Sequence, residues 1–120
     1  MEISAHEIND LKIAEVVSDE VVIQTAADGL DLLGNVYYQG FDGLLLHQHQ
    51  LTPDFFALRT GVAGEILQKF SNYRVRLAIV GDFSYYTSQS LRDFMAESNQ
   101  GRQVSFVSTR EEALQRLARQ

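Results

Sequence analysis

The 120-residue sequence contains no cysteine, only one proline and no long apolar run. The lack of cysteine excludes disulfides, thiolate metal sites, iron–sulfur clusters and a cysteine nucleophile. No apolar stretch approaches the ~20 residues of a membrane-spanning helix, and the first residues lack the basic and apolar regions of a signal peptide, so we expect a cytoplasmic protein. Because 45% of the residues are hydrophobic, the chain is expected to fold. Its length suits one hydrophobic core, and we predict a single domain over residues 1–120.

Basic residues are scarce in the first half of the chain. Residues 1–58 carry one base and ten acids (−9), whereas residues 59–120 carry nine bases and six acids (+3), which together give the net charge of −6. The bases of the second half are spaced singly, without the runs or sheet motifs of nucleic-acid-binding proteins, so we expect no nucleic-acid partner. The two halves could instead pair with each other, within the fold or between subunits.

The first half of the sequence predicts a hairpin, a helix and a buried strand. Apolar residues flank Asn9-Asp10, two residues that tolerate a left-handed backbone, which is typical of a hairpin turn. A helix over residues 25–39 is indicated by Thr25 as its N-cap, by apolar positions at helical spacing and by Gly40 as its stop. The continuously apolar residues 44–46 predict a central strand that is covered on both faces.

The second half alternates predicted helices and strands. Thr52-Pro53-Asp54 opens a second helical region, which Gly61 and Gly64 divide into a short turn up to Arg59 and a helix from Thr60. The remaining predicted elements are a strand at 75–80, a helix at 88–98, a strand at 104–107 and a helix opened by Thr109 and Glu112. The order β-β-α-β-α-β-α-β-α predicts an α/β domain with a mixed sheet of about five strands.

Several stretches along nearly the whole chain resemble one bacterial family. These stretches are Leu33-Gly34-Asn35 with Tyr38, Phe41-Asp42-Gly43-Leu44, Pro53-Asp54-Phe55-Phe56, residues 64–82, and Ser90-Leu91-Arg92-Asp93-Phe94 with Glu97-Ser98-Asn99. The family is known only as a domain of unknown function (family 4180). The resemblance therefore implies that the chain shares the fold of these relatives, and it assigns no activity.

The order of the elements also resembles the anti-sigma-factor-antagonist fold (STAS, SpoIIAA-like). In that family a Ser-Gly or Thr-Gly pair at the start of the second helix can be the regulatory phosphorylation site, so the resemblance implies this role for Thr60 with Gly61. The sequence departs from the family pattern in two places. Leu58-Arg59-Thr60-Gly61 replaces the family's Asp-Ser-Ser-Gly approach, and an extra segment, residues 52–58, separates the strand from the helix.

Polar side chains follow two predicted strands, at 44–46 and 75–80. They are His47, His49, Asp82, Ser84, Tyr85 and Tyr86. Open α/β sheets bind ligands beyond the carboxyl ends of their strands, so these side chains converge if the two strands are parallel neighbours. His47, Asp82 and Tyr85 could then perform general acid–base chemistry. A ligand-binding set would comprise His47, His49, Ser84 and Tyr86.

Simpler explanations compete with each of these sites. His47 and His49 could ligate one metal, but two histidines are too few, so we predict neither a metal site nor a cofactor and interpret the pair as exposed or hydrogen-bonded. The segment Gly61-Val62-Ala63-Gly64 could seat an anion beside Arg59, but we favour close packing of the helix on the sheet as the reason for its glycines. Aromatic residues at helical spacing should be core, and any that stay exposed would mark an interface. These residues are Tyr37, Tyr38, Phe41, Phe55, Phe56, Phe70 and Tyr73.

The sequence therefore supports two functional hypotheses. The first is a bacterial regulatory or protein-interaction module of STAS-like architecture, whose partner is another protein or a second copy of the chain. It is favoured because the sequence lacks a nucleophile elbow, a zinc-protease motif and a P-loop, which weighs against an enzyme. The alternative is a small-molecule-binding or hydrolytic protein that uses the His/Asp/Tyr cluster at the strand ends.

Overall fold

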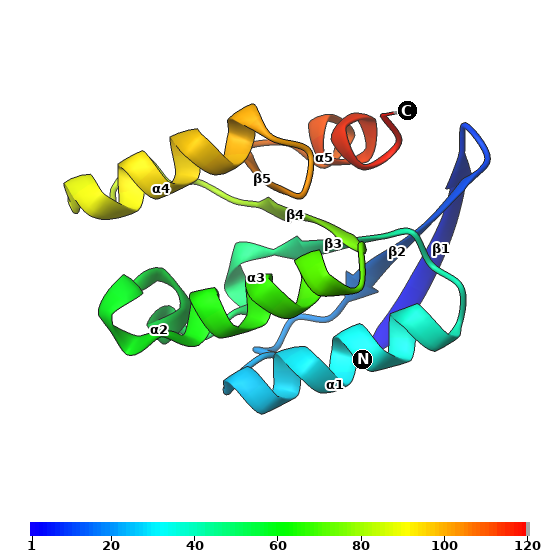
Figure 1. The fold of residues 1–120 in the computed structure, drawn as a ribbon, viewed down its shortest axis with the longest axis horizontal. Helices are drawn as coiled ribbons and strands as arrows, with labels where there is room; N and C mark the ends of the chain where they lie inside the picture. Colours follow the sequence, from blue (N-terminus) through cyan, green and yellow to red (C-terminus); the bar gives the residue numbers. More distant parts are fainter. Residues whose placement is uncertain (120) are drawn as a thin grey trace.

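The computed structural model describes residues 1–119, and its centre is a five-stranded mixed sheet (Figure 1). The strands lie side by side in chain order, with β1 antiparallel to β2 and the other neighbours parallel. Their bounds are β1 Glu2–Ile8, β2 Leu11–Val17, β3 Gly43–His47, β4 Arg76–Val80 and β5 Val104–Val107. The predicted α/β domain with a five-stranded mixed sheet is confirmed.

The turn between β1 and β2 has the expected backbone. Asn9 and Asp10 have φ values of 53° and 65°, both in the left-handed region. Two such residues form the turn whose twist matches the twist of paired strands, so the β1–β2 hairpin follows from local sequence.

Five α-helices accompany the sheet in the described part of the chain. Their bounds are α1 Ala26–Tyr38, α2 Pro53–Phe56, α3 Val62–Asn72, α4 Gln89–Gln100 and α5 Arg110–Leu117. α1 begins at a capping box, in which the Thr25 hydroxyl accepts the Asp28 N–H and the Asp28 carboxylate accepts the Thr25 N–H. No helix of residues 1–119 is both long and apolar enough to span a membrane.

The second helical region is divided at Gly61, as predicted, whereas Gly64 lies within α3 and the helix starts two residues after the predicted Thr60. Two short 3-10 turns, η1 (Gln48–Gln50) and η2 (Leu58–Thr60), flank α2, and α3 starts at Val62. Gly61 has a φ of 78° and joins η2 to α3. Because a side chain strains this left-handed conformation, glycine is the residue best suited to this position.

The two faces of the sheet carry different layers. Helices α1, α3 and α4 cover one face and enclose the larger core, which includes Val16, Leu44 and Phe70. Among the described residues, α5 is the one helix on the opposite face, over a smaller core that includes Ile13 and Leu45. Since successive strand residues alternate between faces, Glu15 lies on the α5 face with Ile13, and His47 lies there with Leu45.

Candidate functional site

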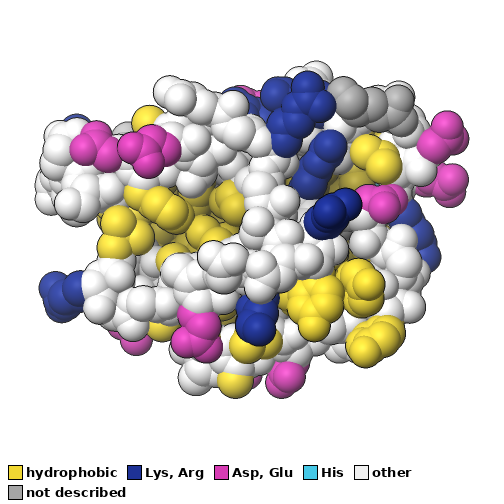
Figure 2. Space-filling view, in the orientation of Figure 1, with side chains coloured by type: hydrophobic (Ala, Val, Ile, Leu, Met, Phe, Trp, Pro, Cys, Tyr) yellow, Lys and Arg dark blue, Asp and Glu magenta, His cyan; other side chains and the backbone are white. Residues whose placement is uncertain are grey.

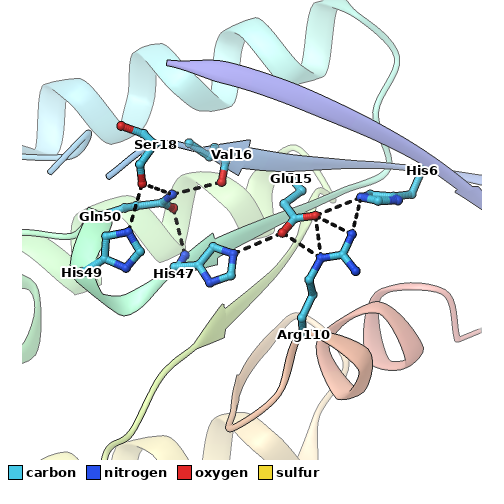
Figure 3. A network of polar contacts seen from close by, with 8 residues as sticks. All are labelled: His6, Glu15, Val16, Ser18, His47, His49, Gln50 and Arg110. Atoms are coloured by element: carbon cyan, nitrogen blue, oxygen red, sulfur yellow. Dashed lines mark hydrogen bonds and ion pairs between the residues drawn. The ribbon is translucent and has the colours of Figure 1, made fainter. Parts of the chain in front are cut away.

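A polar cluster built around Glu15 lies on the α5 face of the sheet. Figure 3 shows the Glu15 carboxylate enclosed by His6 of β1, His47 of β3 and Arg110 of α5. Arg110 Nε lies 2.9 and 3.0 Å from the two carboxylate oxygens, and Arg110 Nη2 lies 2.9 Å from Oε1. The Nε2 atoms of His6 and His47 lie 3.0 and 3.2 Å from Oε1 and Oε2. We call these four residues the Glu15 cluster.

Burial and hydrogen bonding act in opposite directions on Glu15. Its side chain is 8% exposed, and this burial alone would raise its pKa. Hydrogen bonds from Arg110, His47 and His6 outweigh the burial and lower the pKa from 4.5 to about 2. Glu15 is therefore ionised at neutral pH, and its charge is neutralised locally by Arg110.

The His6 ring nitrogen has two possible hydrogen bonds and can make one at a time. With a proton on Nε2, it donates to Glu15 Oε1; without that proton, it accepts from Arg110 Nη2, which lies 3.2 Å away. His47 has a simpler role, because its Nε2 faces only a carboxylate and must donate to it. The Nε2 atoms of His6 and His47 are thus both engaged within the Glu15 cluster. No group of three or more potential ligands within residues 1–119 is arranged to hold a metal ion.

A buried glutamine joins the end of β2 to the end of β3. Gln50 is 1% exposed, its Nε2 donates to the carbonyls of Val16 and Ser18, and its Oε1 accepts the His47 N–H at 2.9 Å. His49 Nε2 lies 3.0 Å from the same Ser18 carbonyl and must donate to it (Figure 3). His47 and His49 therefore have different partners, although their ring centroids are 5.9 Å apart.

A second arrangement at this end of the sheet is an aromatic groove. Its cavity volume is about 520 Å³, and we call it the Tyr85 groove. Gln48 donates to the phenol oxygens of Tyr85 and Tyr86, at 2.7 and 3.1 Å. The lining residues are Val21, Gln48, His49, Leu51, Pro53, Phe56, Tyr85 and Tyr86. The groove thus brings together three of the residues that the sequence singled out, His49, Tyr85 and Tyr86.

Asp82 and Ser84 lie in a separate hollow. The Asp82 carboxylate accepts the Ser84 hydroxyl at 2.6 Å and the Ser84 N–H at 3.0 Å, and these bonds lower the pKa of Asp82. The hollow has a volume of about 470 Å³ and lies beside the start of α5, where it includes Glu112. Within the described chain, the side chains of His47, Asp82 and Tyr85 bond to different residues, namely Glu15, Ser84 and Gln48.

Thr60 is the last residue of η2, and Gly61 directly precedes α3. Neither residue belongs to the polar segments that follow β3 and β4. The exposed Thr60 hydroxyl lies 2.7 and 2.8 Å from the carbonyls of Asp54 and Ala57, and it accepts the Val62 N–H at 3.3 Å. This hydroxyl therefore ties the α2–η2 segment to the first turn of α3. Any chemical change at Thr60 acts on that connection.

Three tyrosines stay exposed while the phenylalanines of the predicted aromatic core are buried. Tyr37, Tyr38 and Tyr73 are 45%, 88% and 50% exposed. They surround a cavity of about 260 Å³ between α1 and α3, whose lining also includes Leu30 and Lys69. Figure 2 shows hydrophobic side chains gathered over the ends of these two helices, beside basic residues. We call Tyr37, Tyr38 and Tyr73 the tyrosine surface.

Four residues of these arrangements, Glu15, Arg110, Gln48 and Gln50, were not among the predicted site residues. A signal existed for Glu15 only, because it is a charged residue between Ala14 and Val16, within a strand of buried residues. Its partner Arg110 is 95 residues away, and nothing in the local pattern joins the two. The two glutamines follow β3 in a polar segment where any residue could face solvent.

Comparisons with known proteins give a family and no activity. Neither the curated proteins nor the solved structures contain a significant match to this chain. A family model described as Domain of unknown function (DUF4180) matches residues 8–117, a span that runs from the end of β1 to the end of α5. Since this match covers nearly the whole chain, the protein belongs to the DUF4180 family of domains of unknown function.

Proposed function

We propose that this protein is a regulatory protein-interaction module, of the STAS-like architecture that its sequence resembles, and that it associates with a second copy of itself. The observation that carries this proposal is the tyrosine surface. A folded chain of this size can bury its large aromatic residues, yet three tyrosines cluster in water around one cavity. Binding rather than catalysis fits the observation that the side chains of His47, Asp82 and Tyr85 bond to different residues.

The tyrosine surface has the composition of a binding site. Tyrosine supplies a large, rigid contact area with little loss of conformational freedom, and it is among the residues that dominate binding energy. The ring centroids of Tyr37, on α1, and Tyr73, directly after α3, are 5.0 Å apart. The two helices therefore present these rings as one unit. The cavity beside them can receive a side chain of the partner.

Charge complementarity favours a second copy as the partner. α1 carries Asp28 and Asp31 and no base, whereas Lys69 lines the cavity on α3 and Arg74 follows Tyr73. In a two-fold dimer each contact occurs twice, so the acidic α1 of one copy would face the basic end of α3 in the other. This arrangement uses the opposite charges of the two halves of the chain.

Regulation would act through Thr60. A phosphate on this hydroxyl removes the hydrogen bonds to the Asp54 and Ala57 carbonyls and places negative charge at the positive end of α3, next to Arg59. α3 also carries Lys69, so a shift of its first turn would move Lys69 relative to the tyrosine surface.

Sedimentation velocity over a concentration series tests the self-association. The wild-type chain is expected to shift from its 13.5 kDa monomer toward a dimer, and Tyr38→Ala should weaken this association by at least about tenfold. Tyr85→Ala is the matched control, because it removes a 63% exposed tyrosine elsewhere on the molecule and should leave association unchanged. A wild-type protein that stays monomeric at all concentrations, or a dimer indifferent to Tyr38→Ala, contradicts the proposal.

The regulatory part has its own test. Thr60→Asp should change the dimer dissociation constant, whereas Thr60→Val removes the hydroxyl without adding charge and isolates the effect of lost hydrogen bonds. Equal dissociation constants for the wild type and Thr60→Asp would remove the switch from the proposal and leave the self-association intact.

A further inference from the structure

We propose that the Tyr85 groove binds a small, uncharged, planar aromatic molecule that carries a hydrogen-bond acceptor. The groove lies beyond the carboxyl ends of three adjacent parallel strands, because Val21 follows β2, Gln48 and His49 follow β3, and Tyr85 follows β4. This is where open α/β sheets bind ligands, and the volume of about 520 Å³ suits a small molecule. The site is separate from the tyrosine surface.

Stacked rings indicate a planar ligand. Tyr85 lies on Tyr86 with 4.6 Å between centroids and 28° between planes, and Tyr86 lies on Phe56 at 5.2 Å and 23°. Tyr85 ends this stack and is 63% exposed, so the outer face of its ring is open to one more aromatic ring.

Hydrogen bonding indicates an acceptor on the ligand. The Gln48 amide is fully used, because its nitrogen donates to both phenols and its oxygen accepts the Asp82 N–H at 3.0 Å. Both phenol oxygens therefore accept from Gln48. Because Tyr85 and Tyr86 are also hydrogen-bonded to each other, one of the two O–H groups is left to donate to a ligand. Burial, together with the neighbouring Tyr85 phenol, raises the pKa of Tyr86 to about 12 against the opposing effect of Gln48, so this phenol keeps its proton at neutral pH.

The Gln48 amide reaches both phenols because it packs on a glycine. A Cβ on Gly81 would lie 2.6 Å from the Cβ of Gln48, closer than real Cβ atoms come. The residues that follow β3 and β4 thus position the Tyr85 and Tyr86 phenols together. The lining has no Asp, Glu, Lys or Arg, which favours an uncharged ligand.

Ligand titration followed by NMR tests the groove with defined probes. Nicotinamide and quinoline-3-carboxamide carry a planar ring and a carbonyl acceptor, and cyclohexanecarboxamide carries the same carbonyl on a saturated ring. The two aromatic amides should shift the resonances of Gln48, Tyr85 and Tyr86 with dissociation constants below about 10 mM, and the saturated amide should bind at least about tenfold more weakly.

Substitutions at Tyr85 test whether binding depends on its ring and on its hydroxyl. Tyr85→Leu should weaken the binding of the aromatic amides by about tenfold or more. Tyr85→Phe, which keeps the ring, should weaken their binding by a few-fold. Tyr38→Leu, at an exposed tyrosine of the other surface, should have no effect. The inference is overturned if neither aromatic amide binds, if the saturated amide binds equally well, or if Tyr85→Leu binds like the wild type. A failure of self-association would not affect any of these outcomes.

Discussion

At the scale of single residues, Glu15 connects parts of the chain that are up to 95 residues apart. Its carboxylate joins β1, β2, β3 and the first turn of α5 through three other side chains. A buried ion pair contributes little net stability compared with apolar residues, but removing one partner is costly because the other charges lose their counter-ion. The Glu15 cluster should therefore be sensitive to changes at its centre.

We expect Glu15→Gln to destabilise the fold by about 2–3 kcal/mol, because the amide keeps the size of the side chain and removes the charge that Arg110 neutralises. Urea unfolding followed by circular dichroism measures this loss. Glu2→Gln, at an exposed position of β1, is the control and should change stability by less than about 0.5 kcal/mol. Equal effects of the two substitutions would show that the cluster contributes nothing to stability.

The lowered pKa of Glu15 predicts a particular pH dependence. Its folded-state pKa is about 2 and its ordinary value is 4.5, so the stabilisation is present above pH 4.5 and is lost as the pH falls from about 4.5 to about 2. One pKa unit corresponds to about 1.4 kcal/mol, so Glu15 accounts for on the order of 3 kcal/mol of this loss.

The measurement is the free energy of unfolding at a series of pH values between about 2 and 7. The wild type should lose stability more steeply below pH 4.5 than Glu15→Gln, and the two curves should converge at the acid end. Parallel curves over this range would contradict the assigned pKa.

At the scale of helices and strands, local sequence was sufficient for most of the fold. Thr25 with Asp28, the Asn9-Asp10 turn and the apolar residues of β3 are signals within a few residues of the structure that they specify. The choice of sheet face is different, because it depends on packing between distant segments. The sequence contained no signal that α5 alone would cover the face carrying Glu15 and His47.

The same limit applies to the candidate sites. Position beyond the strand ends was enough to select His49, Tyr85 and Tyr86, which line one groove. It was not enough to give side-chain direction, so His47 pairs with Glu15, which is not a strand-end residue, and Asp82 pairs with Ser84 in a separate hollow. The exposure of Tyr37, Tyr38 and Tyr73 likewise depends on how α1 meets α3, which spacing along either helix does not determine.

The contact between α1 and α3 depends on Gly29. A Cβ at this position would lie 2.7 Å from Ile66 Cδ1, whereas a Cβ on Gly34, in the same helix, has no other atom within 4 Å. Alanine is favoured over glycine in a helix by about 1 kcal/mol, and forcing extra atoms into a packed core costs about 1–3 kcal/mol. Gly29→Ala should therefore destabilise the protein, and Gly34→Ala should stabilise it by up to about 1 kcal/mol.

Thermal and urea unfolding of the two alanine variants measure this difference, and a background substitution identifies its cause. Ile66→Val removes the Cδ1 atom that the new methyl group would meet, so Gly29→Ala should cost less in that background than in the wild type. Stabilisation by both alanines would mean that the helices separate freely at Gly29.

At the scale of the whole molecule, the uneven distribution of charge predicts how two copies of the chain associate. The first 58 residues have a balance of −9 and the rest of the chain a balance of +3. Lys69 lines the cavity of the tyrosine surface, and Asp31 lies on α1, the helix that carries Tyr37 and Tyr38. A contact that pairs Asp31 of one copy with Lys69 of another should weaken with salt, because the screening length falls from about 10 Å at 0.1 M to about 3 Å at 1 M.

Charge exchange tests this pairing more specifically than salt does. Asp31→Lys and Lys69→Glu should each weaken the dimer, because each places like charges together twice across the two-fold axis. The double variant Asp31→Lys/Lys69→Glu restores opposite charges, and its dissociation constant should return toward the wild-type value. Glu97→Lys, on α4, makes the same change of net charge as Asp31→Lys at a distant exposed site and should act only through that net charge. If the double variant is as weak as the two single effects combined, Asp31 and Lys69 do not face each other, and the tyrosines must bring the two copies together in another orientation.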